Sequence, residues 1–168
     1  MDPPSNIKKV IIHDTNKNVE EEDEDEGEQE QEAYIYKTLL NQNNHDIMSY
    51  TKQDIKNDKN DILQKLGLRG EEVKVFHKKL KDYRYIHDVH EVKHGSYARW
   101  INLKNKNIKL TNGGVIVKVI YDDKKNTGTV TIRNNMNRFI SISFMNVLFF
   151  QKLTEQEDFL LNVIKYVK

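Results

Sequence analysis

The spacing of apolar residues changes from a helical to a strand period near the middle of the chain. Residues 51–66 and 71–85 carry apolar side chains three or four positions apart, which predicts two amphipathic helices. Residues 33–40 predict a shorter helix. After Tyr85, apolar residues alternate or run continuously over short segments bounded by Asn, Asp and Gly, which predicts strands.

The strand-forming part of the sequence predicts a small antiparallel sheet. The expected strands are residues 97–103, 108–110, 115–121, 129–133, 139–144 and 147–151. Residues 115–121 are almost all apolar and β-branched, as expected of a central strand. Asn112-Gly113 predicts a tight hairpin turn, because both residues tolerate positive φ. Short strands at this spacing favour an SH3-like or OB-like β-barrel.

A terminal amphipathic helix follows the last strand. Thr154 and Glu157 form a capping box before a run of apolar residues that extends to Val167. Because a small open sheet leaves edges unprotected and buries little area, we expect this helix to plug the open end of the barrel. The expected fold class is α+β, with a disordered acidic tail (1–32), a helical region (33–85) and a small β-barrel with the terminal helix (86–168).

The net charge of +1 conceals a separation of opposite charges along the chain. Residues 1–32 carry 12 Asp/Glu and 3 Lys, whereas residues 33–168 carry 24 Lys/Arg and 14 Asp/Glu. Ten of the thirteen residues from Glu20 to Glu32 are acidic, which predicts a solvated, extended segment. This tail either solubilises the chain, covers a basic surface of its own body or docks on a basic partner. The short apolar segment Val10–Ile12 has the character of a strand that adds to a sheet edge.

Composition narrows the possible functions and origin. The absence of cysteine excludes a disulfide scaffold, a cysteine nucleophile, a thiolate zinc site and an iron–sulfur cluster. With 22 Lys against 5 Arg, 18 Asn and 16 Ile, the composition follows A/T-only codons and indicates an AT-rich genome. Lysine replaces arginine readily wherever only a solvated charge is needed. No eighteen-residue apolar run and no signal-peptide pattern occur, so we expect an intracellular protein without a membrane span.

Three short motifs carry a resemblance to a viral group. They are Gly95–Ile101 (GSYARWI), Leu110–Gly114 (LTNGG) and Phe149–Thr154 (FFQKLT). Together they resemble a block in small proteins of the nucleocytoplasmic large DNA viruses, the mimivirus-like and algal viruses. The resemblance covers roughly residues 71–168 and not the acidic tail. It implies a viral origin and a place in the virion or the host cytoplasm, and it implies no activity and no catalytic residue.

Aromatic and basic residues interleave in the strand-forming region, a pattern typical of surfaces that stack bases and bind phosphates. The residues expected to contact nucleic acid are Arg99, Trp100, Lys104, Lys109, Arg133 and Arg138. Tyr97 and Trp100 stand three positions apart, so a strand would point them to opposite faces and place one of them in the core.

The cluster that most resembles a metal site is His87, His90 and His94, with Asp88 and Glu91 between them. On a helix the three imidazoles would share one face and could hold zinc with a water in the fourth position. On a strand only His90 and His94 would share a face, and the segment would be an ordinary polar connection. The spacing matches no catalytic motif.

These observations predict a non-enzymatic binding or structural module that uses no cofactor. The first hypothesis is contact with single-stranded nucleic acid, which requires exposed basic and aromatic residues on one face. The second is a role in a viral protein assembly, which an exposed apolar patch would favour. The third is a metal hydrolase, which requires the three histidines to converge.

Overall fold

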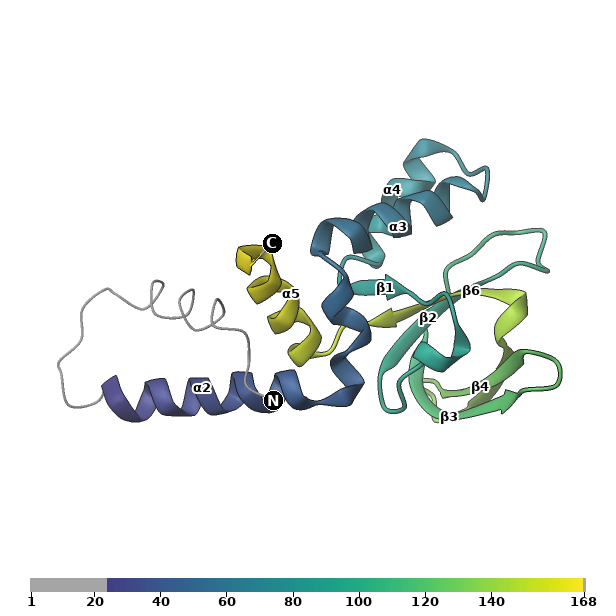
Figure 1. The fold of residues 1–168 in the computed structure, drawn as a ribbon. Coiled ribbons are helices and arrows are strands. Elements are labelled where there is room, and N and C mark those ends of the chain that lie inside the picture. Colours follow the sequence, from purple (N-terminus) through teal and green to yellow (C-terminus); the bar gives the residue numbers. More distant parts are fainter. Residues whose placement is uncertain (1–23, 168) are drawn as a thin grey trace. The chain divides into compact units, whose positions relative to one another are not determined.

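A computed structural model describes residues 24–167 and divides the chain into two compact units. Unit 1 comprises residues 1–52 and 155–168, and unit 2 comprises residues 53–154. The chain thus leaves unit 1, forms the whole of unit 2 and returns to unit 1 (Figure 1). This grouping differs from the boundaries expected after residues 32 and 85, because the last helix joins the N-terminal helix.

Unit 2 is built on one antiparallel sheet beside two helices. The helices are α3 (Lys52–Gln64) and α4 (Gly70–Lys79), and the strands are β1 (Tyr83–Tyr85), β2 (Tyr97–Asn102), β3 (Gly114–Asp122), β4 (Thr127–Arg133), β5 (Phe139–Ser143) and β6 (Val147–Lys152). The strand order is β1-β6-β2-β3-β4-β5. The α+β class is confirmed, but the prediction of a closed barrel is wrong, because β1 and β5 remain the two edges of an open sheet.

The two faces of the sheet bury different clusters. The Trp100 face is defined by Ile86, Val89, Val92, Ala98, Trp100, Ile116, Val130, Ile132, Ile142, Val147 and Phe149. The Phe150 face is defined by Leu63, Val73, Leu80, Tyr83, Ile101 and Phe150. Leu63 and Val73 come from α3 and α4, so these helices cover the part of the Phe150 face that β1, β2 and β6 form. Among the described residues, no β4 or β5 side chain belongs to that cluster.

β1 was not expected, because residues 71–85 read as one helix. Helix α4 ends at Lys79 instead, and the chain turns at Leu80, whose carbonyl accepts a hydrogen bond from the Tyr83 amide at 3.1 Å. Strand β1 then pairs with β6, with Arg84 opposite Gln151. The alternation of Tyr83, Arg84 and Tyr85 suits a strand, because the two tyrosines pack with the Phe150 face and Arg84 points to the other face.

The Asn112-Gly113 dipeptide does not form the predicted tight hairpin. Only Gly113 has a positive φ, of 84°, whereas the expected turn type requires positive φ at both residues. Residues 103–113 form a long connection that touches β2 through one bridge, between Ile101 and Leu110. Glycine is required at 113 because an added Cβ would overlap the carbonyl oxygen of Ala98.

β3 lies between β2 and β4, as expected of a central strand. Only its first residues pair with β2, through Tyr97 opposite Val115 and Ala98 opposite Gly114. The strand therefore extends beyond β2, and Ile120 is exposed near its end. The apolar run predicted continuous burial, but half of the strand has no paired strand on the β2 side.

Unit 1 contains α2 (Glu24–Leu40), the short helices η1 (Gln42–Asn44) and η2 (Asp46–Ser49), and α5 (Glu155–Val167). Residues 24–32 are helical rather than extended, because Glu and Gln are good helix formers and the apolar residues that follow anchor the helix. The remainder of the predicted tail, with Val10–Ile12, lies outside the described residues.

Helix α5 begins directly after Thr154, as the capping box predicts. Instead of plugging a barrel, it packs within unit 1, where the rings of Tyr34 and Phe159 meet edge to face at 5.5 Å. The side-chain amide of Asn41 donates to Gln156 Oε1 at 3.0 Å and fixes the start of α5. Among the described helices, none is long and apolar enough to cross a bilayer.

Candidate functional site

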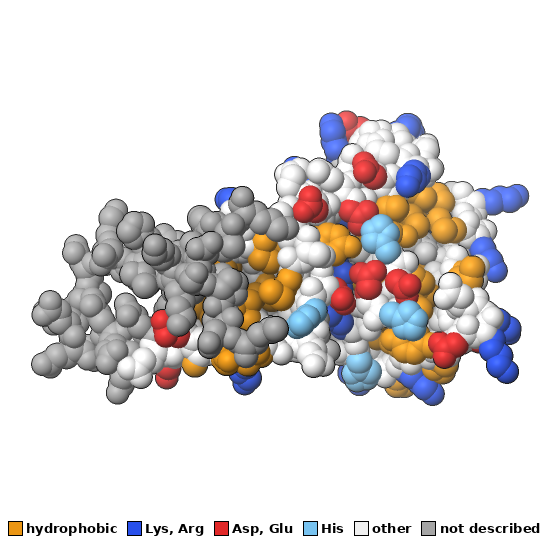
Figure 2. Space-filling model, in the orientation of Figure 1, with side chains coloured by type: hydrophobic (Ala, Val, Ile, Leu, Met, Phe, Trp, Pro, Cys, Tyr) orange, Lys and Arg blue, Asp and Glu red, His pale blue; other side chains and the backbone are white. Residues whose placement is uncertain are grey.

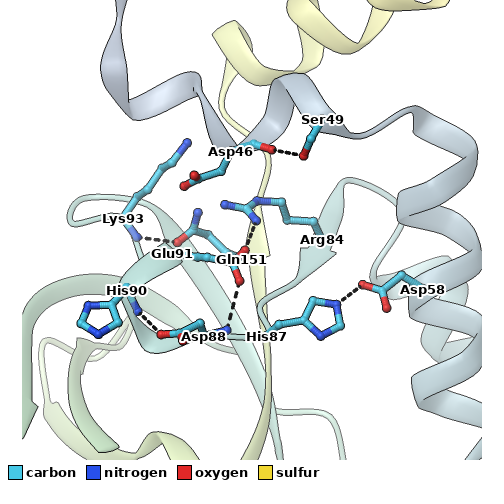
Figure 3. A network of polar contacts seen from close by, with 10 residues as sticks. All are labelled: Asp46, Ser49, Asp58, Arg84, His87, Asp88, His90, Glu91, Lys93 and Gln151. Carbon is cyan, nitrogen blue, oxygen red and sulfur yellow. Dashed lines mark hydrogen bonds and ion pairs between the residues drawn. The ribbon is translucent and has the colours of Figure 1, made fainter. Parts of the chain in front are cut away.

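The histidines of residues 87–94 lie around the short helix η3 (Val89–Glu91) and have separate partners. His87 Nε2 lies 2.7 Å from Asp58 Oδ2 (Figure 3). The His87 ring also meets the Tyr85 ring edge to face at 4.7 Å. The pKa of the Tyr85 hydroxyl is raised, first by burial and then by the carboxylates of Asp58 and Glu91. These contacts orient the imidazole toward α3.

His90 and His94 point to other partners. The His90 ring stacks on Tyr121 at 4.5 Å with an angle of 13° between the planes. His94 Nε2 lies 2.9 Å from the carbonyl oxygen of Val117. Among the described residues, no three His, Asp or Glu side chains are placed to hold a metal ion. The arrangement matches the alternative reading of the segment as a polar connection.

A buried polar network next to these histidines holds β1 and η3 together (Figure 3). Arg84, 3% exposed, donates from Nη1 to Glu91 Oε2 at 2.8 Å. Glu91 Oε1 accepts from the Asp88 amide at 3.1 Å, and Asp88 Oδ1 accepts from the His90 amide at 2.8 Å, which closes a capping box. Arg84 and Glu91 neutralise each other within the protein, so we assign the network a structural role.

Arg99 and Trp100 lie on opposite faces of β2, as neighbouring residues of a strand must. Trp100 is 7% exposed and belongs to the core, which confirms that one aromatic residue of this strand is buried. The Arg99 guanidinium lies 5.7 Å from the centre of the Tyr83 ring, and its Nη1 donates to the Lys79 carbonyl at 3.4 Å. Neither side chain offers the open stacking platform that the sequence predicted.

A pocket of about 360 Å³ is lined in part by Trp100, and it is called the Trp100 pocket here. Its lining residues are Trp100, Thr111, Asn112, Gly113, Asn134, Asn135, Met136 and Ile140. It lies between the end of the 103–113 connection and the turn that joins β4 to β5. No lining residue is charged, and the three asparagines supply amide donors and acceptors.

The wall formed by the β4–β5 turn is held by its own hydrogen bonds. Asn134 Oδ1 accepts from the amides of Met136 and Arg138, each at 2.9 Å. The Tyr97 hydroxyl joins the two walls, because it lies 3.1 Å from the Asn112 carbonyl oxygen and 3.4 Å from Asn135 Oδ1. The side chains of Asn134 and Asn135 and the backbone of Asn112 are therefore held in place around the opening.

Of the six residues predicted to contact nucleic acid, two flank the β4–β5 turn and a third lines the pocket beside it. Arg133 and Arg138 flank the turn, and neither guanidinium has an ion pair or hydrogen bond within the described residues. By strand alternation, Arg138 lies on the same side as Ile140 and the pocket, and Arg133 lies on the opposite side. Trp100 completes this group from within the pocket.

The other three predicted residues lie elsewhere in unit 2. Lys104 and Lys109 are exposed in the 103–113 connection, toward the end of β2 where Leu110 meets Ile101, and Arg99 is on the Phe150 face. Figure 2 shows the same dispersal within unit 2, with Lys and Arg side chains toward its outline and His beside Asp and Glu between them. The predicted single basic face is not formed on the side in view.

Strand β5 forms a second candidate surface that the sequence did not reveal. It pairs only with β4, and no charged residue occurs from Phe139 to Asn146. Phe139 is 67% exposed, and Met136, Ile140 and Met145 are also exposed. An uncharged, apolar edge strand is a typical template for pairing with another chain.

The sequence and the fold were also compared with known proteins. No protein-family model, no curated protein and no solved structure matches the chain.

Proposed function

We propose that the chain is a non-enzymatic binding module whose unit 2 takes single-stranded nucleic acid at the Trp100 pocket. The observation that carries this proposal is the pocket itself, in which Trp100 and three asparagines line a volume of about 360 Å³ without a carboxylate. Ligand pockets of proteins fall in the range of roughly 300–1,000 Å³ and combine apolar walls with a few fixed polar groups.

The chemistry of the pocket suits a nucleobase. Asparagine amides present a donor and an acceptor together, which matches the hydrogen-bonding edges of bases. The apolar walls, from Trp100, Met136 and Ile140, suit the faces of a planar ring. Arg138 on the pocket side and Arg133 behind the turn supply charge for the adjoining phosphates.

The charge of unit 2 supports the same ligand. Residues 53–154 contain 20 Lys/Arg and 10 Asp/Glu, so this unit alone carries the positive charge of the chain. A polyanion that binds here gains free energy by releasing condensed counterions, and the affinity must therefore fall as salt rises. The exposed Lys104 and Lys109 add to this long-range attraction.

We also propose that the open sheet is an SH3-like arrangement rather than an OB-like one. In support, β2 to β5 follow one another as a meander, and β6 returns to lie beside β2 after the single turn of η4 (Phe144–Asn146). An OB fold would require a Greek-key barrel. The pocket then lies between the loops at one end of the sheet, where small β-folds place binding residues.

Trp100 provides a direct test, because it is the only tryptophan in the chain. Titration of the full chain with short single-stranded oligonucleotides should change its emission, and anisotropy of a labelled oligonucleotide should give the affinity. Both signals should weaken with added salt. Binding without any change in Trp100 emission would place the nucleic acid elsewhere on unit 2.

A matched pair of variants locates the site. Asn135→Asp adds a carboxylate to the pocket wall and retains the acceptor for Tyr97, whereas Asn137→Asp adds the same charge to the same turn outside the lining. Asn137 has a φ of 57°, which aspartate also tolerates. We expect Asn135→Asp to weaken binding about tenfold or more, relative to Asn137→Asp, by like-charge repulsion and lost base contact. Equal losses in the two variants would reject the pocket.

The second candidate function is a role in a protein assembly. The observation that favours it is the group of exposed apolar residues on and beside β5. If no oligonucleotide binds at low salt, the assembly role becomes the better proposal. Participation in a large DNA virus, which the sequence resemblance implies, stays a prediction under either function.

A further inference from the structure

We infer that β5 pairs with β5 of a second copy of this chain, in an antiparallel register centred on Ser141. This surface is separate from the nucleic-acid contacts of the Trp100 pocket, although Ile140 borders both. That the partner of β5 is a second β5 follows from the direction of the backbone groups along this strand and from the order of its side chains.

The backbone groups that face the free edge can be identified from the β4–β5 ladder. The Asn134 amide donates to the Arg138 carbonyl at 2.9 Å, and Arg133 lies opposite Phe139. Hydrogen-bonded and non-hydrogen-bonded pairs alternate along an antiparallel ladder. The amides and carbonyls of Phe139, Ser141 and Ser143 therefore point away from β4, toward the open edge.

A second β5 offers the same groups in matching positions. When two copies run antiparallel about Ser141, Ser141 faces Ser141 of the second copy, and Phe139 faces Ser143 of the second copy. The pairs Ser141–Ser141 and Phe139–Ser143 join residues whose backbone groups point outward, so each of these pairs can exchange both of its hydrogen bonds, and the Ile140–Ile142 pairs between them are the non-hydrogen-bonded ones. A register shifted by one residue would instead place residues whose backbone groups point outward opposite residues whose backbone groups point toward β4.

The side chains also fit this register. Ile140 of one copy lies opposite Ile142 of the other, on the Trp100 face of the sheet, so apolar side chains meet apolar side chains. Arg138 lies opposite Phe144 rather than opposite another cation. Since β5 carries no charge, two copies approach without like-charge repulsion along the strand, although unit 2 as a whole is basic.

The size of the contact predicts a weak dimer. A stable protein interface buries about 1,200–2,000 Å² in total, and a pair of five-residue strands falls below this range. The exposed Phe139 extends the contact on the face opposite to Ile140. Charge screening should leave the dimer intact or strengthen it as salt rises, whereas the same salt weakens binding to nucleic acid.

Sedimentation of the full chain over a concentration series tests the inference. We expect a reversible monomer–dimer equilibrium. Ser141→Lys and Ser141→Glu should each give monomers, because two like-charged side chains would face each other across the two-fold axis, from Cα atoms about 5.5 Å apart. An equimolar mixture of these two variants should form a heterodimer, since the facing charges are then opposite.

The control is Thr131→Lys, which adds the same charge to the neighbouring position on β4. Thr131 pairs with Ser141 across β4 and β5, one strand away from the edge, so two copies of the substituted side chain lie farther apart than the Debye length of about 8 Å. The control should dimerise like the natural sequence, and circular dichroism should show that all variants are folded. A natural chain that stays monomeric up to about 1 mM, where even weak contacts of about 4 kcal/mol are populated, overturns the inference. Dimers of both Ser141 variants, or a mixture without rescue, would also overturn it.

Discussion

The two edges of the sheet in unit 2 differ in length, charge and burial. β1 has three residues, and its central Arg84 is buried in an ion pair with Glu91. β5 has five residues, no charge, and an exposed Phe139. Short strands and charged residues are the usual protection of sheet edges, and β5 has neither. The sheet therefore protects one edge and leaves the other available for pairing.

Because of this difference, β1 contributes to the stability of unit 2, whereas β5 is available for binding. At β1, substitutions remove partners from buried charged or polar groups, and such losses are expensive. At β5, substitutions change side chains that already contact water, and such changes rarely alter stability by more than about 0.5 kcal/mol. If the comparison is right, variants at the two edges should fall into two distinct classes.

The largest effect is expected from Arg84→Met. The substitution leaves the Glu91 carboxylate, 19% exposed, without its cationic partner, and breaking a buried pair in this way costs about 3–5 kcal/mol. Urea unfolding followed by Trp100 emission should measure the loss, because Trp100 reports on unit 2. The control is Arg69→Met, whose guanidinium is 90% exposed and lies 3.8 Å from Glu72, and which should change stability by less than about 0.5 kcal/mol. Similar effects of the two substitutions would remove the distinction between the protected edge and the surface.

Local sequence patterns predicted much of the sheet and the chain's last helix. Alternation and β-branched content located β2 to β6, and the same alternation predicted that either Tyr97 or Trp100 would be buried. Thr154 and Glu157 located the start of α5. These features depend on residues within a few positions of each other, which is why a single sequence reveals them.

The features that the sequence did not predict correctly depend on contacts between residues far apart in the chain. Whether a sheet closes is decided by which edges meet, and nothing near Phe139 or Tyr83 specifies that. β1 is three residues long and follows a helical pattern, so only its pairing with β6 distinguishes it from a helix end. Asn112 and Asn135 looked like ordinary turn residues, and they form one pocket only because two distant loops meet.

The role of Arg84 could have been inferred from the composition of the sequence. In a chain with 22 Lys and 5 Arg, an arginine marks a position where planar hydrogen-bonding chemistry is retained. Arg84 and Arg99 fit this reading, through the Glu91 ion pair and the Tyr83 ring, whereas the exposed Arg69 does not. The same reasoning directs attention to Arg133 and Arg138, whose guanidinium groups have no such partner within the described residues.

A smaller loss is expected from Lys59→Met, which removes a support of the turn before β1. Lys59 is buried, and its ammonium donates to the carbonyls of Leu80 at 2.7 Å and Lys81 at 3.2 Å, at the end of α4. Leaving these acceptors unsatisfied should cost about 1–3 kcal/mol at neutral pH. The exposed Lys56, on the same helix, provides the control, and Lys56→Met should be close to neutral.

The same lysine predicts a dependence on pH. Burial lowers the pKa of Lys59 below its ordinary value of 10.5, with Asp82 opposing the shift. Between the folded and unfolded pKa values the unfolded chain binds more protons, so the contribution of this group to stability rises with pH in that window. Below the window the contribution is constant. The difference in free energy of unfolding between the natural chain and Lys59→Met should therefore change as pH approaches 10.5. A difference that stays constant with pH would contradict the assigned burial.

The smallest effect on stability is expected at the open edge, from Phe139→Lys. Phe139 is 67% exposed and belongs to neither buried cluster, so the free energy of unfolding should change by less than about 0.5 kcal/mol. The matched control is Ile120→Lys, which replaces another exposed apolar residue on β3, away from the edge. Both variants should unfold like the natural chain, but only Phe139→Lys should weaken self-association, because Phe139 faces the second copy and Ile120 does not. A large loss of stability in Phe139→Lys would show that β5 is part of the packed core after all, and the contrast between the two edges would then fail.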